Sequence, residues 1–330
     1  MLPNIYSRET MIRLERFKFW LLITVLTIYG TAGFASCSSN EGNATEQSNI
    51  TNIADKVWAY CQTHPDGFTI NISTMTKPAE GIAVGYIPVE GKVAKIIERG
   101  TILFGTTGDY RPLSFCEADG TYWGFGIEVA KEIAKRIGVG VQFIKTSWPT
   151  LTADVLAEPQ LFDLAIGGIT ITDTRRETML MSDGYLANGK TILCRASEAE
   201  RYKSLADIDK PEVTVMVNPG GLNEKFANEN LTQAKIVVHT KNEEIPALIA
   251  EGEADVMITE ITEAPYYVQT DTRLAAPLLN APFTHGEIGV LMQKGQEDLL
   301  RMVNNVIRQM KSDGSLRKLH EKYGLVYAYE

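Results

Sequence analysis

The feature that most constrains the fold is an alternation of short apolar segments with amphipathic segments from Lys92 onward. Short apolar runs predict buried strands, and apolar residues spaced three or four apart predict helices. The first series comprises a helix at 93–97, a strand at 101–105, a helix at 127–137, and strands at 141–144 and 163–166. The second series comprises strands beginning near 191 and at 213–217, 236–238 and 255–259, with helices at 226–230 and 245–249; a strand at 288–292 and a final helix at 297–323 follow. This pattern predicts an α/β fold with mostly parallel sheets, in two domains with a ligand crevice between them.

The length of the chain indicates how many domains it forms, and its charge excludes some kinds of function. A chain of 330 residues exceeds the size at which one core stops growing, about 250 to 300 residues, which also favours two domains. The net charge of -9 and the absence of a run of Lys and Arg exclude a typical nucleic-acid binder. An anionic ligand would therefore need basic residues placed locally in its site.

Residues 1–37 have the pattern of an export signal. Basic residues precede an apolar stretch at 19–35, whose end overlaps the tetrapeptide Phe34-Ala35-Ser36-Cys37. This resembles a bacterial lipoprotein signal, in which Cys37 becomes the lipid-carrying N-terminus and gives attachment to the membrane. Cleavage near Ala35 and an uncleaved anchor are the alternatives, because the apolar stretch is at the lower length limit for spanning a bilayer. All three predict an exported chain.

Residues 38–92, between the export signal and the α/β pattern, form two segments of different composition. Residues 38–50, rich in Ser, Asn and Glu, predict a flexible tether. Residues 51–92 predict a small α+β extension, a helix and a hairpin, to which the sequence assigns no role.

Cysteine and histidine patterns indicate no metal site. Besides Cys37 there are Cys61, Cys116 and Cys194, with no CxxC spacing, so one disulfide and buried free thiols are both compatible with the sequence. The histidines are far apart, and no Walker loop, GxGxxG or GxSxG motif is present. We therefore expect neither a metal nor an organic cofactor.

Two polar segments follow predicted strands and are candidate ligand sites. In 105–115, glycines and a proline predict a tight turn from which Asp109 and Tyr110 project at the sheet edge. The alternative for Asp109 is that it caps the turn and binds no ligand. Thr170 precedes Arg175 by five residues. A guanidinium group matches a carboxylate in two parallel hydrogen bonds, and a threonine hydroxyl can complete that shell. We choose Arg175 over the neighbouring Arg176; the alternative is that Arg175 lies on the surface.

These segments together resemble the exported solute-binding proteins for polar amino acids. The shared pattern is a strand, a polar turn, an aromatic residue and a hairpin, then Gly124-Phe125 opening a helix, followed by Thr170 and Arg175 as the ligand-carboxylate clamp. The resemblance implies a two-domain periplasmic binding protein-like fold of type II. The first domain is then 93–188 plus 283–330, and the second is 189–282.

Several further stretches resemble the cyclohexadienyl dehydratase branch of that family. They are 105–112, 146–151, 188–191 and 217–226, the last containing Asn218-Pro219-Gly220-Gly221. The resemblance covers about residues 95 to 325 and implies dehydration and decarboxylation of prephenate to phenylpyruvate, or of arogenate to phenylalanine.

Glu260 and Glu263 lie where a strand runs into a helix. If a helix begins there, the spacing of three places both carboxylates on one face; the alternative is that acidic residues simply favour the first turn of a helix. By the resemblance, Glu263 is the general acid and Glu260 occupies the position of an ammonium-binding Asp. A general acid must be protonated near neutral pH, so burial should raise the pKa of Glu263.

Other residues are candidates for binding a small dianionic or amino-acid ligand. Lys190 offers a second cation, and Asn218 with the Gly220 and Gly221 backbone forms a polar loop at a helix start. Trp148 could wall the ring or be an ordinary core aromatic residue. Leu222 replaces the hydroxyl residue more usual in that loop.

Two other function classes stay open at this point. One is a non-catalytic binding lipoprotein that delivers a polar amino acid to an ABC importer, the only case in which a permease is the partner. The other is a ligand-sensing or scaffolding module that uses residues 50–92.

Overall fold

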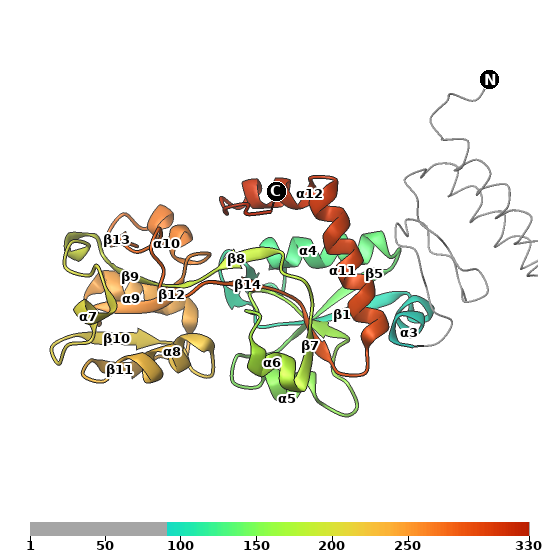
Figure 1. The fold of residues 1–330 in the computed structure, drawn as a ribbon, viewed down its shortest axis with the longest axis horizontal. Helices are drawn as coiled ribbons and strands as arrows, with labels where there is room; N and C mark the ends of the chain where they lie inside the picture. The colour runs from blue at the N-terminus through green and yellow to red at the C-terminus, as the bar shows by residue number, and fades with distance from the viewer. Residues whose placement is uncertain (1–90, 330) are drawn as a thin grey trace, which may run out of the picture. The chain divides into compact units, whose positions relative to one another are not determined.

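The computed structural model describes residues 91–329 (Figure 1). The predicted export signal, tether and nearly all of the 51–92 extension, including Cys37 and Cys61, lie outside this part of the chain. Among the described residues, no helix has both the length and the apolar character needed to cross a membrane. Cys116 and Cys194 are free thiols.

The helices and strands agree closely with the predicted alternation. The helices are α3 (Lys92–Arg99), α4 (Phe125–Arg136), α5 (Leu151–Val155), α6 (Asp173–Thr178), α7 (Leu205–Ile208), α8 (Leu222–Asn230), α9 (Ile245–Glu251), α10 (Ala264–Thr270), α11 (Glu297–Ser312) and α12 (Ser315–Lys322), with 3-10 turns η3 (Ala196–Glu198) and η4 (Asn242–Glu244). The strands are β1 (Thr101–Thr106), β2 (Asp109–Tyr110), β3 (Ser114–Cys116), β4 (Tyr122–Trp123), β5 (Gly140–Lys145), β6 (Leu164–Ala165), β7 (Met179–Met181), β8 (Leu186–Asn188), β9 (Lys190–Arg195), β10 (Thr214–Val217), β11 (Lys235–Val238), β12 (Val256–Glu260), β13 (Leu274–Ala275), β14 (Gly286–Ile288) and β15 (Leu291–Gln293).

Two five-stranded sheets form the framework, in the orders β5-β1-β6-β15-β7 and β11-β10-β12-β9-β13. The pairs β1–β6, β10–β11 and β10–β12 are parallel, whereas β9 and β15 run antiparallel to their neighbours. The prediction of mostly parallel sheets holds for strand direction, because β11, β10, β12 and β13 run the same way and β9 alone runs against them in the second sheet. Each sheet is nevertheless mixed, not purely parallel. The reason is that β9 and β15 each follow a segment linking the two sheets, not the helical crossover that parallel neighbours need.

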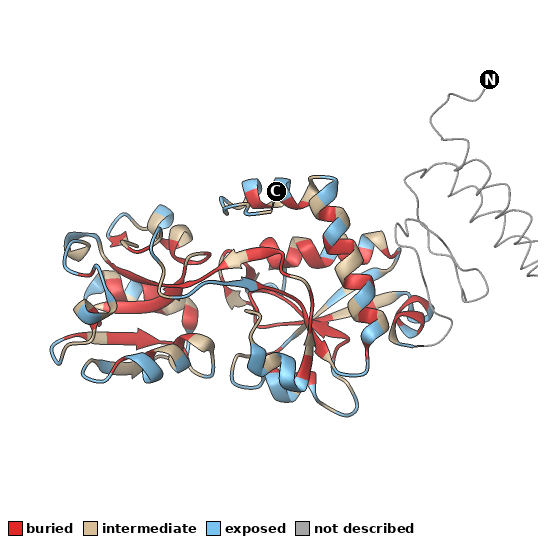
Figure 2. Cartoon of the chain, viewed as in Figure 1, coloured by how far each residue is buried: buried red, intermediate tan, exposed pale blue. Residues whose placement is uncertain are grey.

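The second sheet is buried on both faces, as the near-continuous apolar runs in its strands predict. Successive side chains of a strand point to opposite faces, so Val215, Val256 and Ile258 join one core cluster and Met216 and Met257 the other. Helix α8 contacts β10 and β12 in the first cluster, and α9 contacts β9 and β12 in the second. Figure 2 shows the resulting pattern, with buried residues along the central strands and exposed ones on the outer sides of the helices.

The chain passes from the first sheet to the second through β8 and returns through β14. These two strands pair antiparallel, with Asn188 opposite Gly286. By their internal contacts the described residues divide between two compact units, 91–101 with 134–140 in the first and 102–133 with 141–329 in the second. In the described part of the first unit, α3 buries Val93, Ile96 and Ile97. The domain limits proposed from the sequence remain a prediction.

Two predicted elements prove to be interrupted. The apolar run at 288–292 is not one strand, because β14 ends at Ile288 to pair with β8 and β15 begins at Leu291 to pair with β6 and β7. The predicted helix at 297–323 is two helices, since Gly314 adopts a left-handed conformation, φ 76°, between α11 and α12.

Candidate functional site

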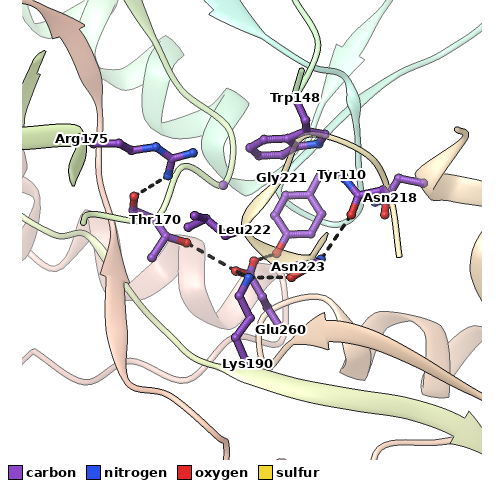
Figure 3. Close-up of a pocket in the computed structure, with 12 residues that line it drawn as sticks. Tyr110, Trp148, Thr170, Arg175, Lys190, Asn218, Gly221, Leu222, Asn223 and Glu260 are labelled. Atoms are coloured by element: carbon purple, nitrogen blue, oxygen red, sulfur yellow. Dashed lines mark hydrogen bonds and ion pairs between the residues drawn. The ribbon is translucent and has the colours of Figure 1, made fainter. Parts of the chain in front are cut away.

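A small cavity lies where loops and strand ends of both five-stranded sheets meet. Its volume is about 20 Å³, enough for about one water molecule. Its lining residues are Tyr110, Trp148, Gly168, Thr170, Arg175, Lys190, Asn218, Gly221, Leu222, Asn223, Asn242 and Glu260 (Figure 3). Eight of these are among the residues that the sequence analysis selected, so one cavity gathers most of the candidates.

Two aromatic rings form one wall of this cavity. Tyr110 ends β2, which pairs with β3, and its ring meets that of Trp148 edge to face at 5.7 Å between centroids. The Trp148 Nε1 donates a hydrogen bond of 3.1 Å to Asp109 Oδ1. Asp109 is absent from the cavity lining and holds the indole in place, so its carboxylate supports the wall from outside.

Arg175 lines the cavity from α6. The side chain of the N-cap residue Thr172 accepts a hydrogen bond from the Arg175 backbone N–H, which positions the first turn. Arg175 Nη1 donates to the Thr170 carbonyl oxygen at 2.6 Å. Burial lowers the pKa of Arg175 to about 10, whereas the neighbouring Arg176 is exposed to solvent.

A buried ion pair forms the part of the lining that the Tyr110 hydroxyl contacts. Glu260 ends β12 directly opposite Lys190 in the antiparallel register, and Lys190 Nζ lies 2.6 Å from Glu260 Oε1. Lys190 Nζ also donates to Asn223 Oδ1 at 2.6 Å, and the Tyr110 hydroxyl donates to Glu260 Oε2. Burial raises the pKa of Glu260, with a further contribution from the charge of Glu263, and burial lowers the pKa of Lys190 to about 7. Burial therefore disfavours the charged form of both partners, although the ion pair keeps them in contact.

Glu263 lies directly behind the cavity wall. It is the N-cap residue of α10, which begins at Ala264, and Glu260 belongs to the strand; the two carboxylates do not share a helix face. The Glu263 side chain is 0% exposed, and its oxygens accept hydrogen bonds from Asn242 Nδ2, at 3.1 Å, and Thr259 Oγ1. Burial raises the pKa of Glu263 to about 7, although both of these hydrogen bonds oppose that shift.

The glycine loop before α8 contributes only in part. Asn218 and Gly221 line the cavity, but the Gly220 amide donates to Glu224 Oε2 at 2.6 Å and Gly220 is not a lining residue. Gly220 has φ 74°, and a Cβ there would lie 2.5 Å from Pro149 Cα. Its role is thus to let the loop approach the segment that carries Trp148.

Four lining residues were not predicted as site residues; Leu222 was noted from the sequence only as a departure from the usual loop pattern, and the other three were not noted. Asn223 belongs to the stretch 217–226. Asn242 follows β11 near the carboxyl edge of the sheet, and this position is the sequence signal that could have identified it. Gly168 carries no side-chain signal; a Cβ there would lie 2.3 Å from the Tyr110 ring.

A second, larger cavity of about 240 Å³ adjoins the first. It shares Thr170, Lys190, Leu222 and Glu260 with the first cavity and continues along α8 and the segment before β14. Leu222 is thus part of the partition between the two spaces. Among residues 91–329, no group of three or more His, Cys, Asp or Glu side chains could hold a metal ion.

Comparisons with known proteins agree with this architecture. The model of bacterial extracellular solute-binding proteins, family 3, matches residues 102–326. A cyclohexadienyl dehydratase of Pseudomonas aeruginosa is 36% identical over 71% of this chain and 86% of its own length. The L-cystine-binding protein TcyJ of Escherichia coli is 29% identical over 74% of this chain and 90% of its own.

Among solved structures, an ancestral amino acid-binding protein described as a precursor of cyclohexadienyl dehydratase superposes with a TM-score of 0.64. It is 38% identical and covers 70% of this chain and 98% of its own. Relatives of both kinds, enzymatic and ligand-binding, therefore share this fold.

Proposed function

Because the chain belongs to the bacterial extracellular solute-binding proteins, family 3, we propose that it is a catalytic member of that family, a cyclohexadienyl dehydratase. The proposed reaction converts prephenate to phenylpyruvate, carbon dioxide and water, or arogenate to phenylalanine with the same two by-products. The family is extracellular, so we infer that the chain is exported; a lipid on Cys37 is a further proposal.

The observation that carries the proposal is the environment of Glu263. A carboxyl group that is 0% exposed and has its pKa raised to about 7 is half protonated at neutral pH, as a general acid requires. A positioned acid of this kind contributes about 10²- to 10⁴-fold to a rate. An amino-acid receptor has no need of this protonated carboxyl group.

The proposed chemistry needs only this one proton. Glu263 gives its proton to the ring hydroxyl oxygen, the carbon–oxygen bond breaks, and water leaves with the bonding electron pair. The bond to the ring carboxylate breaks as well; its electron pair completes the aromatic ring, and carbon dioxide departs. Solvent then returns a proton to the Glu263 carboxylate.

Two cationic side chains support binding of a dianion. Arg175 can hold one carboxylate in paired hydrogen bonds, and Lys190 can hold the other. Since burial raises the pKa of Glu260, its neutral form would release the Lys190 ammonium to the substrate. The cavity of about 20 Å³ must widen to admit a ring, and the hydrogen bond from the Tyr110 hydroxyl to Glu260 is one contact that this widening would break.

A non-catalytic amino-acid receptor is the second candidate. It is favoured by the same ion pair, because an ionised Glu260 could bind the ammonium group while Arg175 binds the carboxylate. The relatives named for L-cystine and for amino-acid binding support it.

The two candidates are separated by assaying the full chain in two ways. Incubation with prephenate and with arogenate is followed by quantifying phenylpyruvate and phenylalanine, and calorimetry measures binding of L-arginine and L-cystine. We expect product formation well above the uncatalysed rate. Tight amino-acid binding without product would make the chain a receptor.

A further inference from the structure

Asn242 bridges the cavity wall and the carboxyl group of Glu263. It begins η4, is 2% exposed, and lines the cavity. Its Nδ2 donates one hydrogen bond to the Asp109 carbonyl oxygen and one to Glu263 Oε1, each at 3.1 Å. A carbonyl oxygen can only accept, so the bond to Asp109 determines which way the amide points.

This orientation leaves the other end of the amide without a partner. Within the described part of the chain, Asn242 Oδ1 is a buried acceptor that receives no hydrogen bond. An unsatisfied buried acceptor costs about 1 to 3 kcal/mol, so a donor on a bound ligand would be favoured there. The cavity that Asn242 lines is where such a ligand would lie.

We propose that Asn242 Oδ1 accepts a hydrogen bond from the ring hydroxyl of the substrate and thereby orients the leaving oxygen toward Glu263. This inference rests on the proposed dehydratase function. When the hydroxyl hydrogen points at Asn242, the lone pairs of the same oxygen are free to take the proton of Glu263. Asn242 would then contact both the acid and the group that the acid protonates.

Asn242 also affects the pKa of Glu263. The Asn242 N–H favours the ionised form of Glu263, and removing it should raise the pKa of that carboxyl group further above about 7. Replacing Asn242 leaves the charged and titratable groups around Glu263 in place. Asp109 raises the pKa of Glu263 and Lys190 lowers it. The charge of Glu263 in turn raises the pKa values of Glu260 and Tyr267.

The test replaces Asn242 with leucine, which has a similar shape but neither donor nor acceptor, in the full chain. For Asn242→Leu we expect kcat/KM for prephenate to fall about 10- to 100-fold, the effect of losing one or two hydrogen bonds. We also expect the alkaline limb of the pH profile to move to higher pH. Inhibition by phenylpyruvate, which lacks the ring hydroxyl, should change by less than about twofold.

Two further variants keep the test decisive. Asn304→Leu is the matched control, because Asn304 is a half-buried amide on α11 that bonds the Asp183 backbone and not the cavity; its profile should equal that of the wild type. If Asn242→Leu does not fold, Asn242→Ser takes its place, with the same direction of change expected.

Three outcomes have distinct meanings. Loss of kcat/KM with a shifted limb and retained phenylpyruvate inhibition supports the inference. Equal loss for prephenate and phenylpyruvate, or an unmoved limb, overturns it by making Asn242 merely structural while the dehydratase stands. A wild-type chain without turnover overturns the proposed function and this inference with it.

Discussion

Two carboxylates three residues apart have different environments, and the difference supports the separate roles proposed for them. Glu260 ends a strand and pairs with Lys190, whereas Glu263 caps a helix among neutral hydrogen-bond donors. Both are buried, but only Glu260 has a cation within hydrogen-bond distance. This contrast favours Glu263 as the proton donor and Glu260 as a binding residue.

The raised pKa of Glu263 predicts a stability effect of definite sign. Between the ordinary pKa of 4.5 and about 7 the folded chain binds a proton that the unfolded chain has lost, so Glu263 reduces stability as pH rises through that range. For Glu263→Gln we expect a gain in the free energy of unfolding of up to about 3 kcal/mol at pH 8, and little change at pH 4.5. Urea unfolding at both pH values measures it. A variant less stable than the wild type at pH 8 would contradict the raised pKa.

Arg175 and Arg176 form a natural pair for testing the proposed carboxylate site. Lysine cannot reproduce the paired hydrogen bonds of a guanidinium group, so Arg175→Lys should weaken ligand binding about 10- to 100-fold. The exposed Arg176→Lys is the control and should leave the affinity unchanged. Calorimetry with the best-bound ligand measures both. Equal affinities for the two variants would mean that Arg175 does not bind the ligand.

At the residue scale, residues that line the cavity were predictable from the sequence where a motif combined a suitable side chain with a position after a predicted strand. Tyr110, Thr170 and Arg175 were selected from motifs, and the structure brings them to one cavity. Asn242 was not predicted because an isolated asparagine belongs to no motif. Its proposed role depends on hydrogen bonds to both Asp109 and Glu263, which are distant in sequence.

At the element scale, the loop before α8 sets how closely two segments approach. Gly220→Ala should place a Cβ against Pro149, at 2.5 Å, in addition to the cost of φ 74°. We expect it to destabilise the chain by about 1 to 3 kcal/mol and to weaken ligand binding.

A matched glycine isolates the steric part of that effect. Gly295 has φ 82°, and a Cβ there would meet nothing within 4 Å, so Gly295→Ala has the conformational cost alone. Thermal unfolding of both variants measures the difference. Equal shifts in melting temperature would contradict the predicted clash.

Element types were predictable from periodicity, but the direction of every strand was not. The alternating pattern located β10, α8, β11, α9 and β12 to within a few residues. It could not show that β9 and β15 run antiparallel, because direction depends on how the chain returns between the sheets. Nor does apolar character alone reveal that 288–292 pairs with two different sheets.

At the scale of the whole molecule, one fold accommodates two functions. The net charge of -9 is unfavourable for an anionic ligand, but the cavity places two cationic side chains locally, the half-buried Arg175 and the buried Lys190. A receptor needs only the clamp and the ion pair, and the proposed enzyme adds a buried acid behind the wall. We therefore infer that Glu263 is the residue that separates catalysis from binding in this fold.

The pH dependence of kcat for prephenate, measured with the full chain and with Glu263→Gln, tests this role of Glu263. We predict that wild-type kcat falls as pH rises through about 7, where the acid form is lost. The variant should lose at least about 100-fold in kcat while phenylpyruvate inhibition changes less than about threefold. The exposed Glu253→Gln is the control and should match the wild type. Wild-type turnover retained in Glu263→Gln would contradict the account.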